Sequence, residues 1–385
     1  MYLPEYRDHS IVNLMSAILK AYGNNSIYKP LRNLDVDALR RSTNLVLLVI
    51  DGLGHEFFIQ HVKKGILARL PCEKITSVFP PTTATAVTTF ATGLAPQQHA
   101  ITGWFMYLKE LGSVVKILPF VPRHGCSAQG FTGDYMQRIL GCEPISSKLN
   151  VGSYFLYPHF LHGSAYRIAT SRGAETIAYE SLSDCLSKIA EVVKSNRRKK
   201  FMYAYWSELD TICHSYGTRS PEAIKHFMEL EQNINKLIRE LRNSNTTVLI
   251  TSDHGLIDTD AEDFINLNLH PELAATLTLP LCGEPRVAYC YVRPSRIRRF
   301  REYVSAKLSP YCTLYRSQDL IKKNFFGLQE PNEKLLDRVG DYILIMKGNY
   351  VVKDFIMGET THILKANHGG VSKEEMYVPL VEITC

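Results

Sequence analysis

The segment Ser77-Val-Phe-Pro-Pro-Thr-Thr-Ala-Thr-Ala-Val-Thr-Thr-Phe-Ala-Thr-Gly93 joins two prolines to a run of small and hydroxyl-bearing residues. Proline fixes φ and donates no hydrogen bond, so Pro80 and Pro81 end an incoming strand and suit the start of a helix. We therefore expect a helix after them, packed closely against a sheet through its alanines. The first turn of such a helix has free N–H groups and the positive end of the helix dipole, which favour an anion.

Two threonines are candidates for that first turn. Thr82 or Thr83 would place a hydroxyl where it can meet a phosphate. The segment taken alone fits a simpler interpretation better, in which a threonine caps the N-terminus of a buried helix. The choice between the two interpretations depends on other parts of the chain.

A buried strand is predicted from Leu45 to Ile50, where six consecutive residues are leucine, valine or isoleucine. Such a run is typical of a strand covered on both faces, as in a parallel sheet. Asp51 follows directly, in the sequence Asp51-Gly52-Leu53-Gly54. Folds of the α/β class place their chemistry at this end of a central strand, although an aspartate before glycine is equally typical of a simple turn.

The remaining pattern alternates helices with buried strands. Helices are predicted over 10–22 and 174–193 and from Ser220-Pro221-Glu222 onward, with Ile224, Phe227, Met228, Ile234, Leu237, Ile238 and Leu241 on one face, and strands are predicted over 201–205 and 247–251. Residues 102–170 are rich in aromatic residues and glycine and predict loops, short strands and short helices over one end of the sheet.

The character of the sequence changes near residue 259. A strand over 287–292 followed by an arginine-rich helix near 295–308 predicts a small β/α unit, and 342–346 returns to a buried strand. We therefore expect a core formed by residues 1–258 and 339–385, interrupted by an inserted cap subdomain over 259–338.

Length and composition are those of a soluble globular protein. The 385 residues suffice for one large α/β domain or two ordinary ones, with 45% hydrophobic and 21% charged residues. The net charge of +6 suits anionic small substrates but does not indicate a nucleic acid polymer as partner. The cluster Arg197-Arg198-Lys199-Lys200 is short and is interpreted as a solvated turn.

The cysteine pattern bears on the compartment. Nine cysteines, an odd number, occur without a CxxC pair, which predicts free thiols in a reducing compartment. The N-terminus lacks the basic and apolar regions of a signal peptide. The sequence has no run of 18 apolar residues, so we expect no membrane-spanning helix. We therefore expect a cytoplasmic protein, with secretion by a leaderless route left open.

Aspartate and histidine gather after the predicted strands. They are Asp51, Asp210 with His214, Asp253 with His254, and His368. Asp210 and His214 are four residues apart, so a helix would place both on one face. Carboxylate with imidazole suits zinc or a similar divalent ion. Six ligands exceed one tetrahedral ion and suit two ions roughly 3.5–4 Å apart, an arrangement used for displacement at phosphorus. Each histidine taken singly is more typical of a structural or surface position.

At these residues the chain resembles the alkaline phosphatase superfamily, and within it most nearly the type I phosphodiesterase/nucleotide pyrophosphatase branch. The motifs that carry the resemblance are Val49-Ile-Asp-Gly52, Phe79-Pro-Pro-Thr-Thr83, Thr92-Gly-Leu-Ala-Pro-Gln-Gln-His99, Asp210-Thr-Ile-Cys-His214, Ser252-Asp-His-Gly255 and Asn367-His-Gly369. Together they span residues 45 to 370, which is nearly the whole chain.

The resemblance implies a fold, a ligand set and a nucleophile. The implied fold is a three-layer α/β/α sandwich around a mostly parallel central sheet, with a small inserted α+β cap. One metal is implied on Asp51, Thr83, Asp253 and His254, and a second on Asp210, His214 and His368. Zinc is the implied metal, with manganese as the alternative. The family nucleophile stands ten residues before the glycine of Thr-Gly, which here is Thr83 and not Thr82.

One position departs from the family pattern. Better-known family diesterases carry, after a His-Gly-Ile segment, an asparagine that holds a phosphate oxygen, whereas His99-Ala-Ile-Thr-Gly-Trp104 places Trp104 there. Trp104 is thus a candidate substrate-binding residue that could stack on a base, although packing in the core is an equal alternative. The Cys-x-Pro-x-Arg signature of sulfatases does not occur.

The expected function is a two-metal hydrolase of small-molecule phosphodiesters or nucleotides that forms a covalent phosphothreonine. The alternatives are a phosphomonoesterase or phosphonate hydrolase and a manganese-dependent phosphomutase of the same superfamily. A non-enzymatic binding protein would be expected to lack a ligand or the nucleophile, and none is missing from the sequence. The oligomeric state is not predicted.

Overall fold

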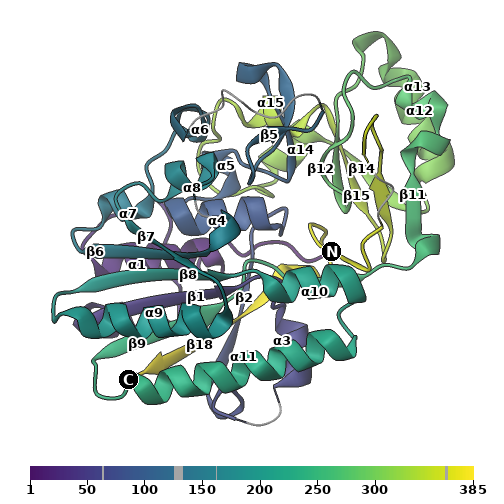
Figure 1. Cartoon of the computed structure of the whole chain (residues 1–385). Helices are drawn as coiled ribbons and strands as arrows, with labels where there is room; N and C mark the ends of the chain where they lie inside the picture. Colours follow the sequence, from purple (N-terminus) through teal and green to yellow (C-terminus); the bar gives the residue numbers. More distant parts are fainter. Residues whose placement is uncertain (63–64, 125–132, 162, 360–362) are drawn as a thin grey trace.

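The chain folds around a seven-stranded sheet, seen in the computed structural model of Figure 1. The structure describes residues 1–62, 65–124, 133–161, 163–359 and 363–385. The strands follow the order β2 (Cys72–Thr76), β18 (Tyr377–Thr384), β9 (Thr246–Thr251), β1 (Asn44–Ile50), β8 (Lys200–Trp206), β6 (Gly152–Pro158) and β7 (Glu175–Tyr179). Strands β9 to β7 are parallel, whereas β18 is antiparallel to both its neighbours. The mostly parallel central sheet is confirmed.

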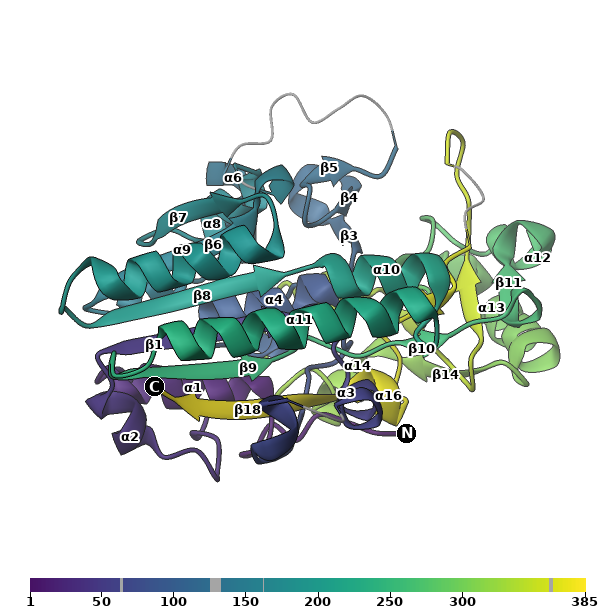
Figure 2. The same cartoon turned by 60° about the horizontal axis from the view of Figure 1, so that its bottom comes forward.

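Helices cover both faces of this sheet, as Figures 1 and 2 show from two sides. Helices α1 (Ile11–Ala21), α4 (Thr83–Thr92) and α8 (Ala165–Thr170) contribute to the core on one face. Helices α3 (His55–His61), α9 (Leu182–Ser195), α10 (Glu208–Tyr216) and α11 (Pro221–Glu240) contribute to the core on the other. The expected three-layer α/β/α sandwich is therefore confirmed.

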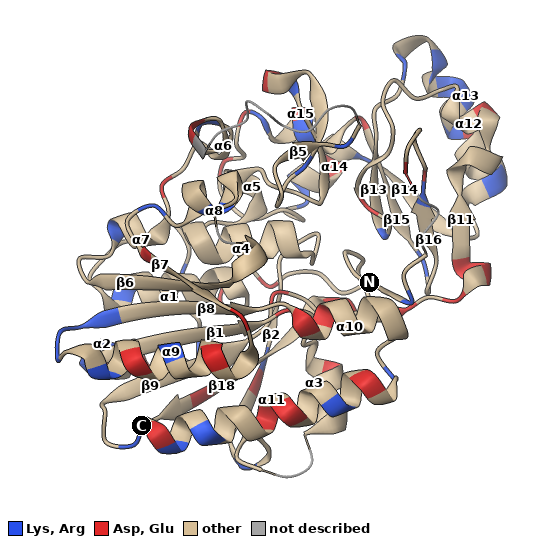
Figure 3. Cartoon of the chain, viewed as in Figure 1, with Lys and Arg blue, Asp and Glu red and all other residues tan. Residues whose placement is uncertain are grey.

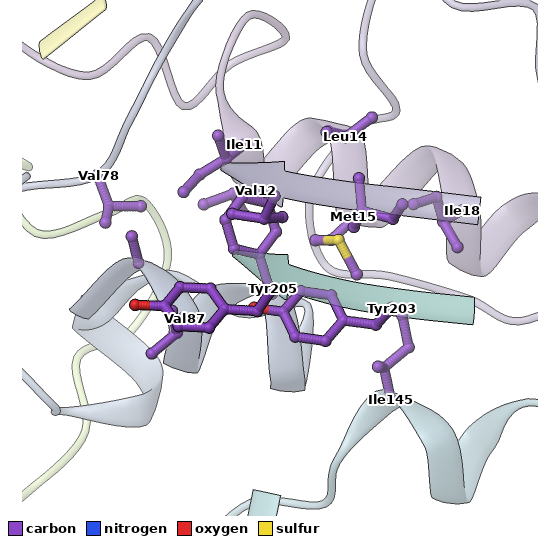
Figure 4. Close-up of a cluster of buried hydrophobic side chains, with 14 of the residues drawn as sticks. Ile11, Val12, Leu14, Met15, Ile18, Val78, Val87, Ile145, Tyr203 and Tyr205 are labelled. Carbon is purple, nitrogen blue, oxygen red and sulfur yellow. The ribbon is translucent and has the colours of Figure 1, made fainter. Parts of the chain in front are cut away.

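Strand β1 shows why the sequence there is apolar without interruption. Successive strand side chains point to opposite faces, so Leu45, Leu47 and Val49 join the first core while Val46, Leu48 and Ile50 join the second. Figure 4 shows part of the first core, where side chains of α1 lie near those of Tyr203 and Tyr205 from β8.

Helix α4 begins where the two prolines predict it, with Thr82 at the N-cap position and Thr83 as the first helical residue. The side chain of Thr82 makes no capping hydrogen bond, so the interpretation of this segment as a simple threonine cap does not hold. Every residue of α4 is buried. The helix ends at Gly93, whose φ of 71° is left-handed and favours glycine.

A second seven-stranded sheet, antiparallel throughout, stands beside the first. Its order is β14 (Cys312–Arg316), β15 (Tyr342–Met346), β13 (Val287–Cys290), β12 (Cys282–Glu284), β3 (Phe105–Leu108), β4 (Ser113–Lys116) and β5 (Val121–Pro122). Strands β12, β13 and β14 fall within 259–338, but β15 and β3 to β5 lie outside that range. The division into a core and a cap over 259–338 stays a prediction, and this sheet crosses its boundaries.

Four local predictions need correction. Lys200, expected in a solvated turn with Arg197, Arg198 and Lys199, is the first residue of β8 and is buried. Residues 175–179 form strand β7 and not the start of a helix, because Ser181 caps α9 by accepting a hydrogen bond from the N–H of Asp184. Residues 152–158, expected among loops and short elements, form the central-sheet strand β6. Met228, expected on the buried face of α11, is 57% exposed.

Other expectations concern cysteines, charge and membrane. Eight cysteines in the described part of the chain are unpaired, and Cys126 lies outside the described residues. Lysine and arginine are spread over loops and helices in Figure 3, with a short run on α13 (Ile297–Tyr303). A search of the described helices finds none long and apolar enough to cross a membrane. The cytoplasmic location stays a prediction.

Candidate metal centre

Polar side chains from neighbouring strands meet at the carboxyl edge of the central sheet. Asp51 follows β1, Asp253 and His254 follow β9, and α10, which carries Asp210 and His214, begins just after β8. Because β9, β1 and β8 are adjacent and parallel, their carboxyl ends lie side by side, where α/β folds bind ligands.

The first group surrounds one nitrogen of His254. Its Nε2 atom lies 3.3 Å from Oδ1 of Asp51 and 3.5 Å from Oδ2 of Asp253. The hydroxyl oxygen of Thr83 lies 3.1 Å from the same nitrogen. Ligand atoms of Asp51, Asp253 and His254 all fall within 4.8 Å of one another, which is compatible with a shared metal ion. These are the four residues expected to hold one metal.

The second group lies beside the first. Nε2 of His214 is 3.2 Å from Oδ2 of Asp210, one helical turn earlier. His368 follows the short strand β17 (Ala366–Asn367), and its ring centroid lies 3.9 Å from that of His254 and 5.2 Å from that of His214. Asp210, His254 and His368 also present ligand atoms within 4.8 Å of one another. The structure thus brings all six expected Asp and His side chains together with Thr83.

Hydrogen bonds to one carboxylate oxygen of Asp51 and of Asp253 leave the other oxygen available to a cation. Oδ1 of Asp253 accepts from the N–H groups of Gly52 and His254, whereas Oδ2 has no hydrogen-bond partner among the described residues. Oδ2 of Asp51 accepts a short hydrogen bond from the hydroxyl of Tyr205, and Oδ1 has none within the described part of the chain. Oδ1 of Asp210 and Nδ1 of His368 are also buried, and no described residue is their hydrogen-bond partner.

The histidines are oriented in the same way. Nδ1 of His254 lies 3.1 Å from the carbonyl oxygen of Gly255, and Nδ1 of His214 lies 2.7 Å from that of Ala366. A carbonyl accepts only from a protonated Nδ1, so Nε2, which lies near a carboxylate in both residues, is the nitrogen left to bind a cation. Metal-ligating histidines in proteins are fixed by such bonds. The residues therefore fit a divalent cation: buried acceptor atoms without donors converge on one place.

Without a cation, the buried charged groups of this site would be energetically unfavourable, as their pKa shifts indicate. Burial, with Asp253 and Asp210 nearby, raises the pKa of Asp51 well above its ordinary value. Burial and the neighbouring His254 lower the pKa of His368. Burial opposes the charge on His214, but contact with Asp210 outweighs it and raises the pKa of His214 to about 9. Buried carboxylates without counter-charge are costly, and a bound cation would remove that cost.

Two residues of the site were not predicted from the sequence. Tyr205 donates a hydrogen bond to Asp51. In the sequence, Tyr205 is marked only as a hydroxyl-bearing residue near the end of a buried strand. Glu284 on β12 accepts hydrogen bonds from the hydroxyl of Thr82 at 2.6 Å and from the N–H of Trp104 at 2.7 Å. Burial raises the pKa of Glu284 to about 7, against the effect of these two donors. No local pattern marks Glu284, because its contacts come from segments some 180–200 residues away.

Trp104 lies at the edge of this region. Its main-chain N–H is directed at Glu284, while its ring is partly buried and packs against the first hydrophobic core. The ring therefore makes the core contacts that were the alternative to base stacking, and its role in substrate binding stays a prediction.

A comparison with sequence models of known families identifies the family of the chain. The sequence model of the family described as "Type I phosphodiesterase / nucleotide pyrophosphatase" matches residues 45–370. The chain belongs to this family. The expected resemblance is confirmed over the range of motifs from which it was drawn, and the chain is a metal-dependent hydrolase acting on phosphoryl groups. A search of curated protein sequences found no match.

Solved structures of family and superfamily members share the fold. Mouse ectonucleotide pyrophosphatase/phosphodiesterase 5, as an inactive variant in complex with AMP, superimposes with a TM-score of 0.67 at 18% identity, covering 87% of each chain. The human enzyme of the same name gives a TM-score of 0.64 at 18% identity, covering 88% of this chain and 87% of that one. Phosphonoacetate hydrolase from Sinorhizobium meliloti, with phosphonoformate, gives 0.61 at 15% identity, covering 88% and 89%.

Proposed function

We propose that the protein hydrolyses phosphodiester bonds of small molecules or nucleotides, with Thr83 as the nucleophile and two divalent ions as cofactors. One observation carries the proposal: the Thr83 hydroxyl, in the first turn of α4, lies 3.1 Å from Nε2 of His254, the nitrogen that also lies 3.3 Å from Asp51 and 3.5 Å from Asp253. The AMP complex of the mouse relative and its family name support a nucleotide-like substrate.

The metal ligands in this proposal are those expected from the family. Asp51, Thr83, Asp253 and His254 would hold one ion, and Asp210, His214 and His368 the other, with zinc as the preferred metal and manganese as the alternative. Such ions supply positive charge that lowers the pKa of a hydroxyl and stabilises the charge that develops on phosphoryl oxygens.

The residues of the chain then divide the work. Thr83 Oγ1 gives up its proton and attacks phosphorus, and the bond between phosphorus and the leaving oxygen breaks. The leaving oxygen takes up a proton and departs as an alcohol, and the phosphothreonine that forms keeps the second ester group of the substrate. The free N–H groups at the start of α4 are placed to bind a phosphoryl oxygen. Water then attacks the phosphothreonine, releasing the phosphate product and restoring the Thr83 hydroxyl. The hydrogen bond from Tyr205 orients Asp51, and the contact with the carbonyl of Gly255 orients His254. Both side chains therefore keep the same position through the two steps.

The phosphonate-hydrolase alternative is supported by the likeness to phosphonoacetate hydrolase and by the local change at Trp104. The indole of Trp104 has no amide with which to hold a phosphate oxygen, so phosphate contacts here are expected to differ from those implied for diesterases with asparagine at this position. A phosphomutase or monoesterase finds no separate support in these contacts.

A substrate panel tests the proposal. Purified protein with added zinc or manganese is assayed on bis-p-nitrophenyl phosphate, p-nitrophenyl phosphate and phosphonoacetate. We expect the diester to give the largest kcat/KM, and acid quenching during turnover to trap the p-nitrophenyl phosphoryl group on the peptide that contains Thr83. Preference for phosphonoacetate would favour the phosphonate alternative, and turnover without a trapped phosphopeptide would argue against the covalent step.

A further inference from the structure

Outside the metal centre, the structure buries a positive charge that has no counter-ion. Arg167 on α8 is 3% exposed, and its Nε and Nη2 atoms have no hydrogen-bond partner among the residues that the structure describes. No ion pair joins it to any carboxylate in the described ranges, and residues 63–64, 125–132, 162 and 360–362 include no aspartate or glutamate. An unpaired buried charge costs several kcal/mol in general, so a protein keeps one where something else compensates it.

Tyrosine rings compensate only part of this cost. The guanidinium carbon lies 4.1 Å from the ring centroid of Tyr157, 5.1 Å from that of Tyr205 and 5.6 Å from that of Tyr166. Ring faces attract a cation but leave the N–H groups without acceptors. The hydroxyl of Tyr203 is also buried and has no hydrogen-bond partner in the described ranges, so these groups leave donors and an acceptor unused around the guanidinium.

A cavity of about 610 Å³ lies against this arginine. Besides Arg167 its walls include Tyr157, Ser171 and the exposed Arg172, with Asp134 as the one carboxylate among the described lining residues. The Asp134 carboxylate makes no ion pair with Arg167. None of the proposed metal ligands lines the cavity, so this place is separate from the metal centre. The cavity is larger than a single inorganic ion, so a small organic molecule that carries an anionic group would also fit.

We propose that this cavity binds a small oxyanion, a phosphate or a carboxylate, with Arg167 as its counter-charge. The guanidinium has a planar fork of N–H donors that matches both groups, and the tyrosines hold that fork in place from its faces. This assignment does not depend on the function proposed for Thr83.

The position of Arg167 also connects the cavity to the metal centre. The ring of Tyr205 lies 5.1 Å from the guanidinium of Arg167, and its hydroxyl donates a hydrogen bond to Asp51. Tyr166, the neighbour of Arg167 in α8, makes a 2.6 Å hydrogen bond with Thr88 of α4, the helix that begins at Thr83. Only Arg167 and Tyr205 therefore separate an anion bound here from the proposed metal ligand Asp51.

Titration of the metal-loaded protein with inorganic phosphate and with succinate tests the assignment, by calorimetry and by the shift in Tm. Phosphate can also bind at the metal centre, so the quantity of interest is the difference between the wild type and Arg167→Met. We expect one class of site to be lost in Arg167→Met, with affinity at least on the order of 10- to 100-fold weaker for the preferred anion. The two probes show whether phosphate or carboxylate is preferred.

Two further variants make the test decisive. Arg172→Met removes the exposed arginine of the same cavity and should weaken binding much less than Arg167→Met. Arg167→Lys keeps the charge but removes the planar fork, and should fold while binding more weakly than wild type. Without added anion, Arg167→Met should melt no lower than wild type, because it removes an unpaired buried charge. Identical titrations of all four proteins, or an Arg167→Met protein that is less stable in every buffer, would show a purely structural cation–π role and overturn the proposal.

Discussion

The hydroxyl oxygen of Thr83 lies 3.1 Å from Nε2 of His254, although 171 residues separate them in sequence. Thr83→Ala removes that hydroxyl and should lower kcat on bis-p-nitrophenyl phosphate by at least ~10³, roughly 4 kcal/mol of barrier. Most metal should stay bound, since the Asp and His ligands are untouched. Elemental analysis and steady-state kinetics on the same sample check both statements.

The adjacent residue provides the control. Thr82→Ala loses only the hydrogen bond to Glu284. It should reduce kcat far less, because the Thr82 hydroxyl is directed at Glu284 and not at His254. Near wild-type turnover in Thr83→Ala together with loss in Thr82→Ala would move the nucleophile to Thr82. If neither change mattered, the covalent intermediate would be wrong.

The metal content depends on the carboxylate atoms that have no protein donor. Asp253→Asn keeps an oxygen for the N–H groups of Gly52 and His254 but replaces the free Oδ2 by an amide that cannot ligate. We expect nearly two divalent ions per wild-type chain and clear loss in the variant, measured by elemental analysis. The exposed Asp260 offers a matched control, and Asp260→Ala should keep full metal content. Full occupancy in Asp253→Asn and His254→Ala would show that these residues are not ligands.

Tyr205 should act on metal affinity through Asp51. Tyr205→Phe removes the hydroxyl that fixes Oδ2 of Asp51, and loss of such a supporting bond typically weakens metal binding by about 10- to 100-fold. Tyr203 lies two residues earlier on β8, and its hydroxyl has no partner, so Tyr203→Phe should leave the affinity unchanged. Competition with a chromophoric chelator measures both. Equal affinities in the two variants would contradict the role given to Tyr205.

His99 should make stability sensitive to acid. Burial, with Arg338 nearby, lowers its pKa to about 3. Between pH 6.5 and 3 the unfolded state therefore binds a proton that the folded state does not, so stability falls as pH falls, by up to about 1.4 kcal/mol per pH unit. His99→Asn keeps an acceptor for the N–H of Ile101 and should lose stability less steeply.

Urea unfolding at pH 6.5 and 4.5 measures this difference, which should be roughly 2–3 kcal/mol. The exposed His159 offers the control, since His159→Asn should follow the wild-type pH dependence. Parallel pH profiles for wild type and His99→Asn would show that His99 does not cause the acid sensitivity.

Long apolar runs made the centre of the fold predictable. The strands after which Asp51, Asp210 and Asp253 stand are buried on both faces, so their sequences are continuous and their ends are easy to find. Strand β6 was missed because its sequence mixes glycine, serine, proline and aromatic residues, and β7 because it is short and partly polar; such sequences fit loops or a helix equally well.

Contacts between distant segments could not be predicted in the same way. Glu284 reaches Thr82 and Trp104 only because β12 pairs with β3, and that pairing requires Gly103 and Gly283 to approach so closely that a Cβ on Gly103 would lie 2.9 Å from Cα of Gly283. Arg167 shows nothing unusual in sequence, and its isolation from any carboxylate appears only in three dimensions.

The placement of β18 has a consequence for how the protein is made. This strand fills the space between β2 and β9, yet some 300 residues separate it from β2 along the chain. While the ribosome is still translating the residues before Tyr377, β2 has no partner in the sheet and one edge of β9 is open. A nascent chain must therefore carry an exposed strand edge through most of its synthesis, and it can bury that edge only after β18 has left the exit tunnel.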